Sequence, residues 1–344
     1  MRLVLVERER SMLKHILSGE DFDLKLIDQV YDYALKFEKL VRQGIELPQT
    51  LQDRVFDLMM FEPSTRTKDS NFSAICRLGG SCTVIDDWSK TSMAKGETLS
   101  DMMADISINF DGVVVRHKED GFAEKIAKYS KVPIINAGDG KRRHPTQSLL
   151  DIVTIRREIG HIDGLKIAIV GDLKFGRTVH SLLEILGLYK NIEIFLISPP
   201  EFALDDHQYL EGADNSIKIH EIDNLEEALS YVNVVYATRY QWERLPEDDK
   251  PSTEEIARVE NQFRIDRKAL TLMSSSSIVM HPFPRREEID RKIDDDRRAA
   301  YFRQMWNGLI TRLALFHLMY EGKDHALGCP YPINRQKYGE ERQN

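Results

Sequence analysis

Residues 64–67 read Ser-Thr-Arg-Thr and gather three hydroxyl groups and one guanidinium directly after the apolar run at 54–61. A helix beginning here would add free backbone N–H groups and the positive end of its dipole. One hydroxyl suffices to cap such a helix, and capping is the plain alternative. Three hydroxyls beside an arginine, whose planar fork matches phosphate oxygens, suit a phosphate-binding site equally well, so this segment alone leaves both interpretations open.

A second basic segment, GDLKFGRT at 171–178, also follows an apolar run. Its two glycines have the spacing of a P-loop, but Arg177 stands where that loop requires lysine. The segment also lacks the G-x-G-x-x-G pattern of dinucleotide-binding folds. We therefore interpret it as a tight strand-to-helix turn whose arginine suits a carboxylate or a phosphate.

Two histidines precede prolines at the ends of apolar runs, His144 in KRRHPTQ and His281 in MHPFPRR. Neither belongs to a metal-ligand spacing such as H-E-x-x-H, and a lone histidine is more often structural than catalytic. Gln147 follows the first of them. Arg239 and Gln241 would share one side of an extended segment, either as a surface ion-pair cluster or as a carboxylate clamp.

Lys95 lies in the polar stretch TSMAKGETLSD at 91–101. The usual fate of a loop lysine is solvation. Ser92 and Gly96 would nevertheless allow the loop to move and cover a site. This stretch alone leaves both interpretations open.

The elements that must position these residues alternate between helix-period segments and short apolar runs. Runs without polar alternation are typical of buried parallel strands, so we predict an α/β protein with two open parallel-sheet domains joined by interdomain helices. Ligands of such sheets bind at the carboxyl ends of the strands, where arginines, histidines and amides collect here. The predicted strands are 54–61, 81–86, 111–116, 132–137, 166–172, 192–198, 232–238 and 276–281, and predicted helices include 23–45 and 65–80.

The domain boundary is predicted near residues 145–150, where HPTQ places a proline in the first turn of a helix. Residues 1–145 form the first domain together with the last helix, 297–322, which is expected to pack back on it. Residues 146–296 form the second domain. The tail at 323–344 has no periodicity.

Composition excludes several classes of protein. The 344 residues are 42% hydrophobic and 30% charged, with a net charge of -8 that disfavours a general nucleic-acid binder. No run approaches the ~18 apolar residues of a membrane span, and the N-terminus resembles neither a signal nor a transit peptide. Cys76, Cys82 and Cys329 suggest no metal spacing or disulfide framework, so a reducing compartment, the cytoplasm, is expected.

The order of the motifs resembles that of aspartate carbamoyltransferases, in the aspartate/ornithine carbamoyltransferase family. The motifs, from about residue 50 to 322, are FEPSTRT, TSMAKGETL, VVRH, NAGDG with HPTQ, GDLKFGRTVHS, TRYQWER and HPFPR. The resemblance implies transfer of the carbamoyl group of carbamoyl phosphate to the amine of L-aspartate, giving N-carbamoyl-L-aspartate and phosphate, in pyrimidine biosynthesis. It implies a homotrimer, no cofactor and no metal. The first domain would bind carbamoyl phosphate and the second would bind aspartate.

The resemblance also implies a role for each motif residue. Carbamoyl phosphate would be bound by Ser64, Thr65, Arg66, Thr67, Arg116, His144 and Gln147, and by Ser92 and Lys95 of a neighbouring subunit. Aspartate would be bound by Lys95, Arg177, Arg239, Gln241 and the backbone carbonyls around Phe283 and Pro284. Catalysis would rest on Arg66, Thr67, Arg116 and His144, the last three acting as an oxyanion hole. Glu62 would tether the domains by pairing with Arg177 and Arg244 when they close.

Two alternatives and three departures remain. One alternative is an ornithine carbamoyltransferase, but such enzymes carry a cysteine in the motif corresponding to HPFPR and lack the lysine of KGET, so both features favour aspartate. The other alternative is a non-catalytic homologue, which would have no need of the intact arginines. Lys68 and Asp69 depart from the usual pattern after STRT, the segment 245–263 is longer than in bacterial relatives, and the tail extends past the usual end. The sequence is silent on regulatory subunits.

Overall fold

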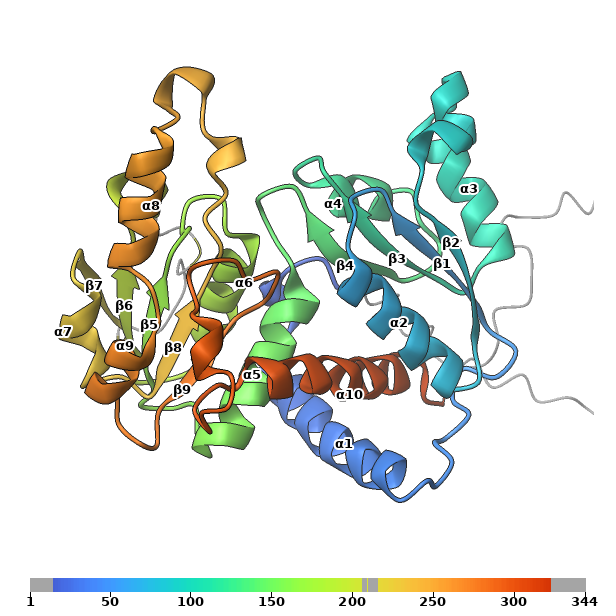
Figure 1. Cartoon of the computed structure of the whole chain (residues 1–344). Helices are drawn as coiled ribbons and strands as arrows, with labels where there is room; N and C mark the ends of the chain where they lie inside the picture. The colour runs from blue at the N-terminus through green and yellow to red at the C-terminus, as the bar shows by residue number, and fades with distance from the viewer. Residues whose placement is uncertain (1–14, 206–208, 210–215, 323–344) are drawn as a thin grey trace, which may run out of the picture.

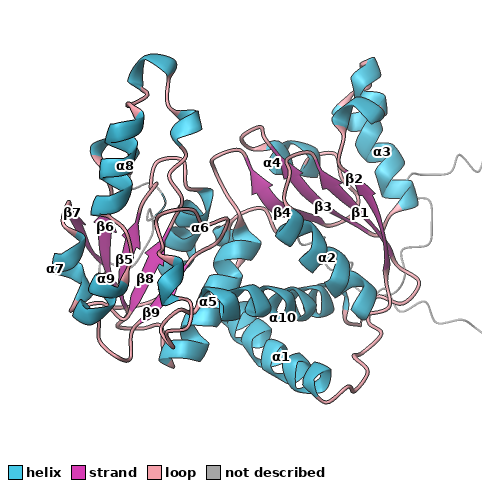
Figure 2. Cartoon of the chain, in the orientation of Figure 1, coloured by secondary structure: helices cyan, strands magenta, loops and turns pink. Residues whose placement is uncertain are grey.

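The computed structural model describes residues 15–205, 209 and 216–322. Within these ranges the chain forms two separate parallel sheets with helices packed around them (Figures 1 and 2). The aperiodic tail at 323–344 lies outside the described residues. The predicted α/β class, with two open parallel sheets, is confirmed.

The first sheet has the strand order β2-β1-β3-β4, and all its pairs are parallel. Its strands are β1 (Val55–Met60), β2 (Ser81–Ile85), β3 (Gly112–His117) and β4 (Ile134–Asp139). The inner strands β1 and β3 are almost wholly buried, whereas β2 is a largely exposed edge strand. Buried parallel strands require continuous apolar runs, which is why the inner strands were predictable from the sequence.

The second sheet has the order β7-β6-β5-β8-β9 and is also parallel throughout. Its strands are β5 (Lys166–Val170), β6 (Glu193–Ile197), β7 (Lys218–Ile222), β8 (Val234–Ala237) and β9 (Ile278–Met280). The sequence analysis missed β7. This edge strand reads KIHEI and is half exposed, so it has no apolar run to reveal it.

The helices are α1 (Leu24–Arg42), α2 (Thr65–Arg77), α3 (Leu99–Asn109), α4 (Phe122–Ala127), α5 (Pro145–Ile159), α6 (Arg177–Leu186), α7 (Leu225–Leu229), α8 (Thr253–Gln262), α9 (Arg267–Leu272) and α10 (Tyr301–Tyr320). The helices predicted at 23–45 and 65–80 are present as α1 and α2, within a few residues of the predicted bounds. The predicted final helix begins late, because Arg298 binds Asp296 at 2.8 Å in a preceding turn. None of the described helices is long and apolar enough to cross a membrane.

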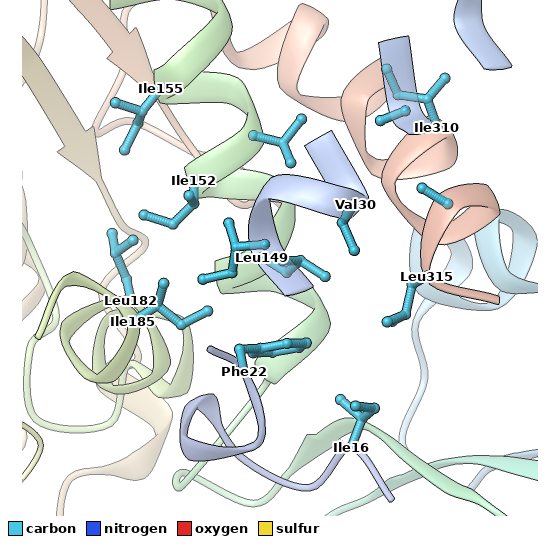
Figure 3. Close-up of a cluster of buried hydrophobic side chains, with 14 of the residues drawn as sticks. Ile16, Phe22, Val30, Leu149, Ile152, Ile155, Leu182, Ile185, Ile310 and Leu315 are labelled. Atoms are coloured by element: carbon cyan, nitrogen blue, oxygen red, sulfur yellow. The ribbon is translucent and has the colours of Figure 1, made fainter. Parts of the chain in front are cut away.

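One helix pair connects the two sheets. The side chains of Ile152 and Ile155 on α5 lie near Leu182 and Ile185 of α6 (Figure 3). Helix α10 packs on α5 and also on α1 and α2, so the predicted return of the C-terminal helix to the first domain is confirmed. Each fully buried Leu or Ile contributes about 1.5–3 kcal/mol, so this shared core resists separation of the two sheets.

The long segment at 245–263 forms a projection beside the second sheet. It contains α8, whose N-terminus is closed by a capping box between Ser252 and Glu255. Trp242 donates to Glu260 at 3.1 Å, which ties the base of the projection to the chain just after Gln241. Figure 1 shows the loop before α8 rising above the second sheet, while Val259 of α8 packs against the core of that domain.

Candidate active site

A cleft of about 790 Å³ lies where carboxyl ends of strands from both sheets meet. The segment after β1, Arg116 at the end of β3 and the segment after β4 supply one wall, and the segments after β5, β8 and β9 supply the other. Most of the residues predicted from sequence line it, namely Glu62, Ser64, Thr65, Arg66, Thr67, Arg116, His144, Gln147, Arg177, Arg239, Gln241, Phe283 and Pro284. The chain therefore gathers residues up to about 220 positions apart into one cavity, as expected for open α/β sheets.

The structure at the start of α2 bears on whether residues 64–67 only cap the helix or can bind a ligand. Ser64 is the N-cap residue in extended conformation, yet its side chain makes no capping hydrogen bond. Its hydroxyl, with the first N–H groups of the helix, is thus available to a ligand. Burial lowers the pKa of Arg66, whose guanidinium lies 5.3 Å from the centre of the Phe283 ring on the opposite wall. This end of the cleft has the groups of an anion site.

Lys68 and Asp69 do not disturb this turn. The Lys68 N–H donates to Ser64 O at 3.1 Å, so the helix is regular there. Asp69 lines the cleft. Lys68 and Asp69 depart from the usual pattern after STRT, but that departure did not predict that Asp69 lines the cleft.

Glu62 joins the two walls of the cleft. Its carboxylate accepts two bonds from Arg177, at 2.6 and 2.8 Å, and one from Arg116 at 2.6 Å. Burial by itself would raise the pKa of Glu62, but hydrogen bonds and charges from the two arginines outweigh it and hold the pKa below its ordinary value. The predicted pairing with Arg177 is present. The pairing with Arg244, which was predicted for closed domains, stays a prediction, and Arg244 here donates to Gly140 O at 3.5 Å.

Two guanidiniums approach each other closely here, and the backbone permits it. A Cβ on Gly138 would lie 2.9 Å from Arg116 Nη1 and 3.1 Å from Arg177 Cζ, and its φ of +117° also suits glycine. Burial, with the charge of Arg177, lowers the pKa of Arg116 to about 10. Arg116 is still charged at neutral pH, and its buried Nε has no partner in the described part of the chain.

His144 is a neutral, buried imidazole at the start of α5. Burial and the charges of Arg116, Arg177 and Arg312 hold its pKa well below 6.5. Its backbone N–H donates to Ser181 Oγ at 2.8 Å, which links this loop to α6. A neutral imidazole keeps one N–H, so His144 is equipped to donate a hydrogen bond rather than to carry charge.

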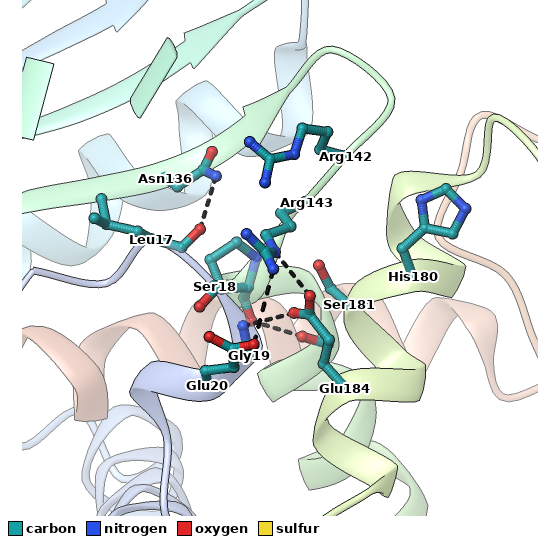
Figure 4. A network of polar contacts seen from close by, with 12 residues as sticks. Leu17, Ser18, Gly19, Glu20, Asn136, Arg142, Arg143, His180, Ser181 and Glu184 are labelled. Carbon is teal, nitrogen blue, oxygen red and sulfur yellow. Dashed lines mark hydrogen bonds and ion pairs between the residues drawn. The ribbon is translucent and has the colours of Figure 1, made fainter. Parts of the chain in front are cut away.

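An ion network behind His144 was not predicted. Arg143 binds Glu184 of α6 at 2.7 Å, and Glu184 also accepts from Gly19 N at 2.8 Å (Figure 4). Arg143 also binds Glu124 of α4 at 2.8 Å. These partners lie up to 165 residues apart, so no local pattern signals them. The network holds the loop that carries His144 against both walls.

The far end of the cleft carries Arg239 and Gln241. Arg239 pairs with the exposed Glu243 at 2.7 Å, and Gln241 donates to Asp172 at 2.9 Å. Burial raises the pKa of Asp172 to about 6. The sequence left open a surface ion-pair cluster or a carboxylate clamp. Arg239 is compatible with both, because it forms an ion pair with Glu243 and also lines the cleft. A ligand carboxylate could replace Glu243 at this guanidinium.

Ser92 and Lys95 are not brought to the cleft. They lie on an exposed helical turn, Ser92–Lys95, and neither residue lines the cleft. Just before this turn, the Trp88 ring packs edge-on against the Phe61 ring. Their predicted arrival from a neighbouring subunit stays a prediction. Residues of α10 that the motifs did not single out, Gln304, Met305, Gly308, Leu309 and Arg312, do line the cleft. Among the described residues, no three His, Cys, Asp or Glu side chains gather in a way that could hold a metal ion.

Two parallel sheets that share an arginine-rich cleft at their carboxyl ends define an α/β enzyme class that binds anionic substrates between domains. Family models agree. Residues 14–157 match the aspartate/ornithine carbamoyltransferase carbamoyl-P binding domain, and residues 163–319 match the Asp/Orn binding domain of the same family.

Individual relatives extend along most of the chain. The aspartate carbamoyltransferase catalytic subunit of Methanocaldococcus jannaschii is 40% identical over 312 residues, covering 91% of this chain and 99% of the relative. A crystal structure of that subunit matches with a TM-score of 0.81, over 90% of this chain and all of the other. A Trypanosoma cruzi aspartate transcarbamoylase in complex with carbamoyl phosphate and aspartate matches with a TM-score of 0.81 at 35% identity, covering 88% and 94%. The chain belongs to the aspartate/ornithine carbamoyltransferase family.

The bridge at Glu62 leads to a stability prediction. Since the folded-state pKa of Glu62 lies below its ordinary value of 4.5, its ionised form stabilises the fold at higher pH, and this contribution is lost as the pH falls through the folded-state pKa. We expect Glu62→Gln to lower the free energy of unfolding at pH 7 by on the order of 1–3 kcal/mol, because two guanidiniums lose their acceptor. Denaturant unfolding at several pH values measures this.

The pH dependence is the decisive part of that experiment. The difference between wild type and Glu62→Gln should shrink as the pH falls through the lowered folded-state pKa of Glu62, because the wild-type carboxyl then becomes protonated as well. Glu46→Gln serves as control because Glu46 is exposed. A Glu62→Gln difference that stays constant from neutral to acid pH would contradict the role of the ionised bridge.

Proposed function

We propose that this protein transfers the carbamoyl group of carbamoyl phosphate to the amine of L-aspartate, releasing phosphate and N-carbamoyl-L-aspartate for pyrimidine biosynthesis. The observation that carries the proposal is a single cleft with a helix N-terminus and Arg66 at one end and Arg239 at the other. A ligand with a phosphate at one end and carboxylates at the other fits this charge distribution. The family of the chain and its substrate-bound relative support the same reaction.

The proposed chemistry needs no protein nucleophile. The aspartate amine attacks the carbamoyl carbon, a new N–C bond forms, and the C–O bond to phosphate breaks. Negative charge grows on the carbonyl oxygen, where Arg116, Thr67 and the neutral His144 donate hydrogen bonds. The leaving phosphate takes the amine proton and remains at the start of α2, bound by residues 64–67.

Aspartate would occupy the second wall. Its two carboxylates bind Arg177, Arg239 and Gln241, and carbonyls of the turn at Phe283 and Pro284 accept from substrate amino groups. Arg177 is engaged with Glu62, so its guanidinium is already held in place in the cleft before aspartate binds. Preorganisation of this kind reduces the cost of binding. Ornithine would bring an ammonium to Arg239, which repels it.

The assembly completes the proposal. We assign carbamoyl phosphate binding to residues 1–145 with 297–322, and aspartate binding to 146–296. The working unit is a cytoplasmic homotrimer in which Ser92 and Lys95 of one subunit reach the cleft of the next. The exposure of both residues, outside the cleft of their own chain, supports this arrangement.

The function is tested with purified protein, carbamoyl phosphate and either L-aspartate or L-ornithine, with detection of the ureido product. We expect equal amounts of ureido product and phosphate with aspartate, and a kcat/KM at least about 100-fold lower with ornithine. Activity with ornithine alone would favour the ornithine enzyme. No product with either amino acid would favour the non-catalytic homologue and would overturn the proposal.

A further inference from the structure

Asp151, on α5, is a buried carboxylate to which the proposed reaction gives no role. Its side chain has no exposed surface. Oδ1 accepts hydrogen bonds from Gln147 Nε2 at 2.9 Å and from Gln304 Nε2 at 2.7 Å. Oδ2 accepts one from the Tyr236 hydroxyl at 2.8 Å. Both glutamines line the cleft, so Asp151 lies directly behind its wall.

Burying this carboxylate is costly. Burial raises the pKa of Asp151 to about 7, against the hydrogen bonds and the charge of Arg312. Arg312 is itself buried, but its guanidinium donates to Gly308 O and Thr146 Oγ1 rather than to Asp151. A buried acid without a direct ion pair is a poor way to stabilise a fold. Its three donors instead point to a role in orienting side chains.

The orientation of the Gln304 amide follows from a backbone donor. The N–H of His281 can only donate, and it lies 2.9 Å from the Gln304 side-chain oxygen. That contact makes the facing atom Oε1, so the other end, Nε2, is directed at Asp151 Oδ1. Oδ1 is therefore an acceptor, whatever the placement of hydrogens elsewhere.

The orientation of the Gln147 amide follows in turn. Turned the other way, its oxygen would lie 2.9 Å from the acceptor Oδ1 and the two atoms would repel. Nε2 must therefore face Asp151, which leaves Oε1 of Gln147 as an acceptor at the cleft wall. A carbamoyl NH₂ group is a donor and needs such an acceptor.

We infer that Asp151 is a positioning residue that makes the cleft selective for an NH₂-bearing acyl phosphate, because it holds the Gln147 amide with its oxygen available to the ligand. The inference rests on the proposed function, whose first substrate carries that NH₂ group. Acetyl phosphate, in which a methyl group replaces the NH₂, lacks the donor and leaves Gln147 Oε1 unpaired. Discrimination between these two ligands is the property that Asp151 controls.

The test compares binding of freshly dissolved carbamoyl phosphate and acetyl phosphate, by calorimetry in the cold without aspartate. Wild type should prefer carbamoyl phosphate by about tenfold in Kd. Asp151→Leu has the same number of side-chain heavy atoms but no acceptor, so its preference should fall to within about twofold. Asp151→Asn keeps an oxygen for the two glutamines while its amide donates to the Tyr236 hydroxyl, so it should retain most of the preference.

Inorganic phosphate binding reports on the fold of each variant and should be unchanged. If Asp151→Leu keeps the wild-type preference, or loses affinity for both acyl phosphates equally, the inference is overturned. Should Asp151→Leu not fold, Gln147→Met must lose the preference, and a Gln147→Met protein with wild-type selectivity overturns the inference as well. Wild type that binds selectively but forms no ureido product would contradict the proposed function and leave the inference standing.

Discussion

Arg66→Ala is expected to lower kcat/KM for the ureido product by about 10³-fold, or ~4 kcal/mol of transition-state stabilisation. Arg66 lies in the first turn of α2 and is the one residue of the Ser-Thr-Arg-Thr segment with a charged side chain. The departing phosphate gains charge as the C–O bond breaks, so loss of a guanidinium fork affects the transition state more than the ground state. Steady-state kinetics with both substrates varied measures the effect.

Two variants sharpen the interpretation of that loss. Arg66→Lys keeps the charge but not the planar fork, so its kcat/KM should fall between wild type and Arg66→Ala. Arg77→Ala alters the last turn of the same helix, where Arg77 donates a hydrogen bond to Ser73 at 3.1 Å and lies outside the cleft, and should leave the kinetics unchanged. Near-normal turnover by Arg66→Ala would refute the phosphate-binding role of the segment.

Local chemistry explains what the sequence predicted well. The proposed anion site at the start of α2 depends on consecutive residues, 64–67, and on a helix that starts among them, so residue type and spacing carry most of the information for it. The sequence could not decide between capping and ligand binding. The structure adds that Ser64 occupies the N-cap position but its hydroxyl makes no capping hydrogen bond, so this hydroxyl is available to a ligand.

Contacts between distant residues explain what the sequence could not predict. Strand β7 is held by pairing with β6 rather than by an apolar pattern of its own. Asp151 is bonded to side chains 85 and 153 positions away, and an aspartate inside a helix gives no sign of them. Glu62 also accepts a hydrogen bond from Arg116, 54 positions away, which the motifs did not imply. Such contacts depend on how distant parts of the chain are placed relative to each other in the fold, which no local segment encodes.

Mixed trimers should restore activity that neither parent variant has. Lys95→Ala and Arg66→Ala chains are each expected to be nearly inactive, because each removes one contribution to every cleft. If Lys95 acts across subunits, any trimer with both kinds of chain contains one cleft with Arg66 from one chain and Lys95 from its neighbour. Such trimers should show about a third of wild-type activity by the closure of a three-fold ring.

The experiment uses co-expressed chains with different affinity tags and verified mixed trimers. Arg66→Ala mixed with Arg116→Ala is the matched control, since both residues line the cleft of the same chain and no mixed trimer can rebuild a complete site. Activity in the first mixture but not in the second would assign Lys95 to the neighbouring cleft. Mixed trimers of Lys95→Ala and Arg66→Ala that stay inactive would show that the exposed turn Ser92–Lys95 serves no shared site, and the substrate would then have to be closed in by the chain's own residues.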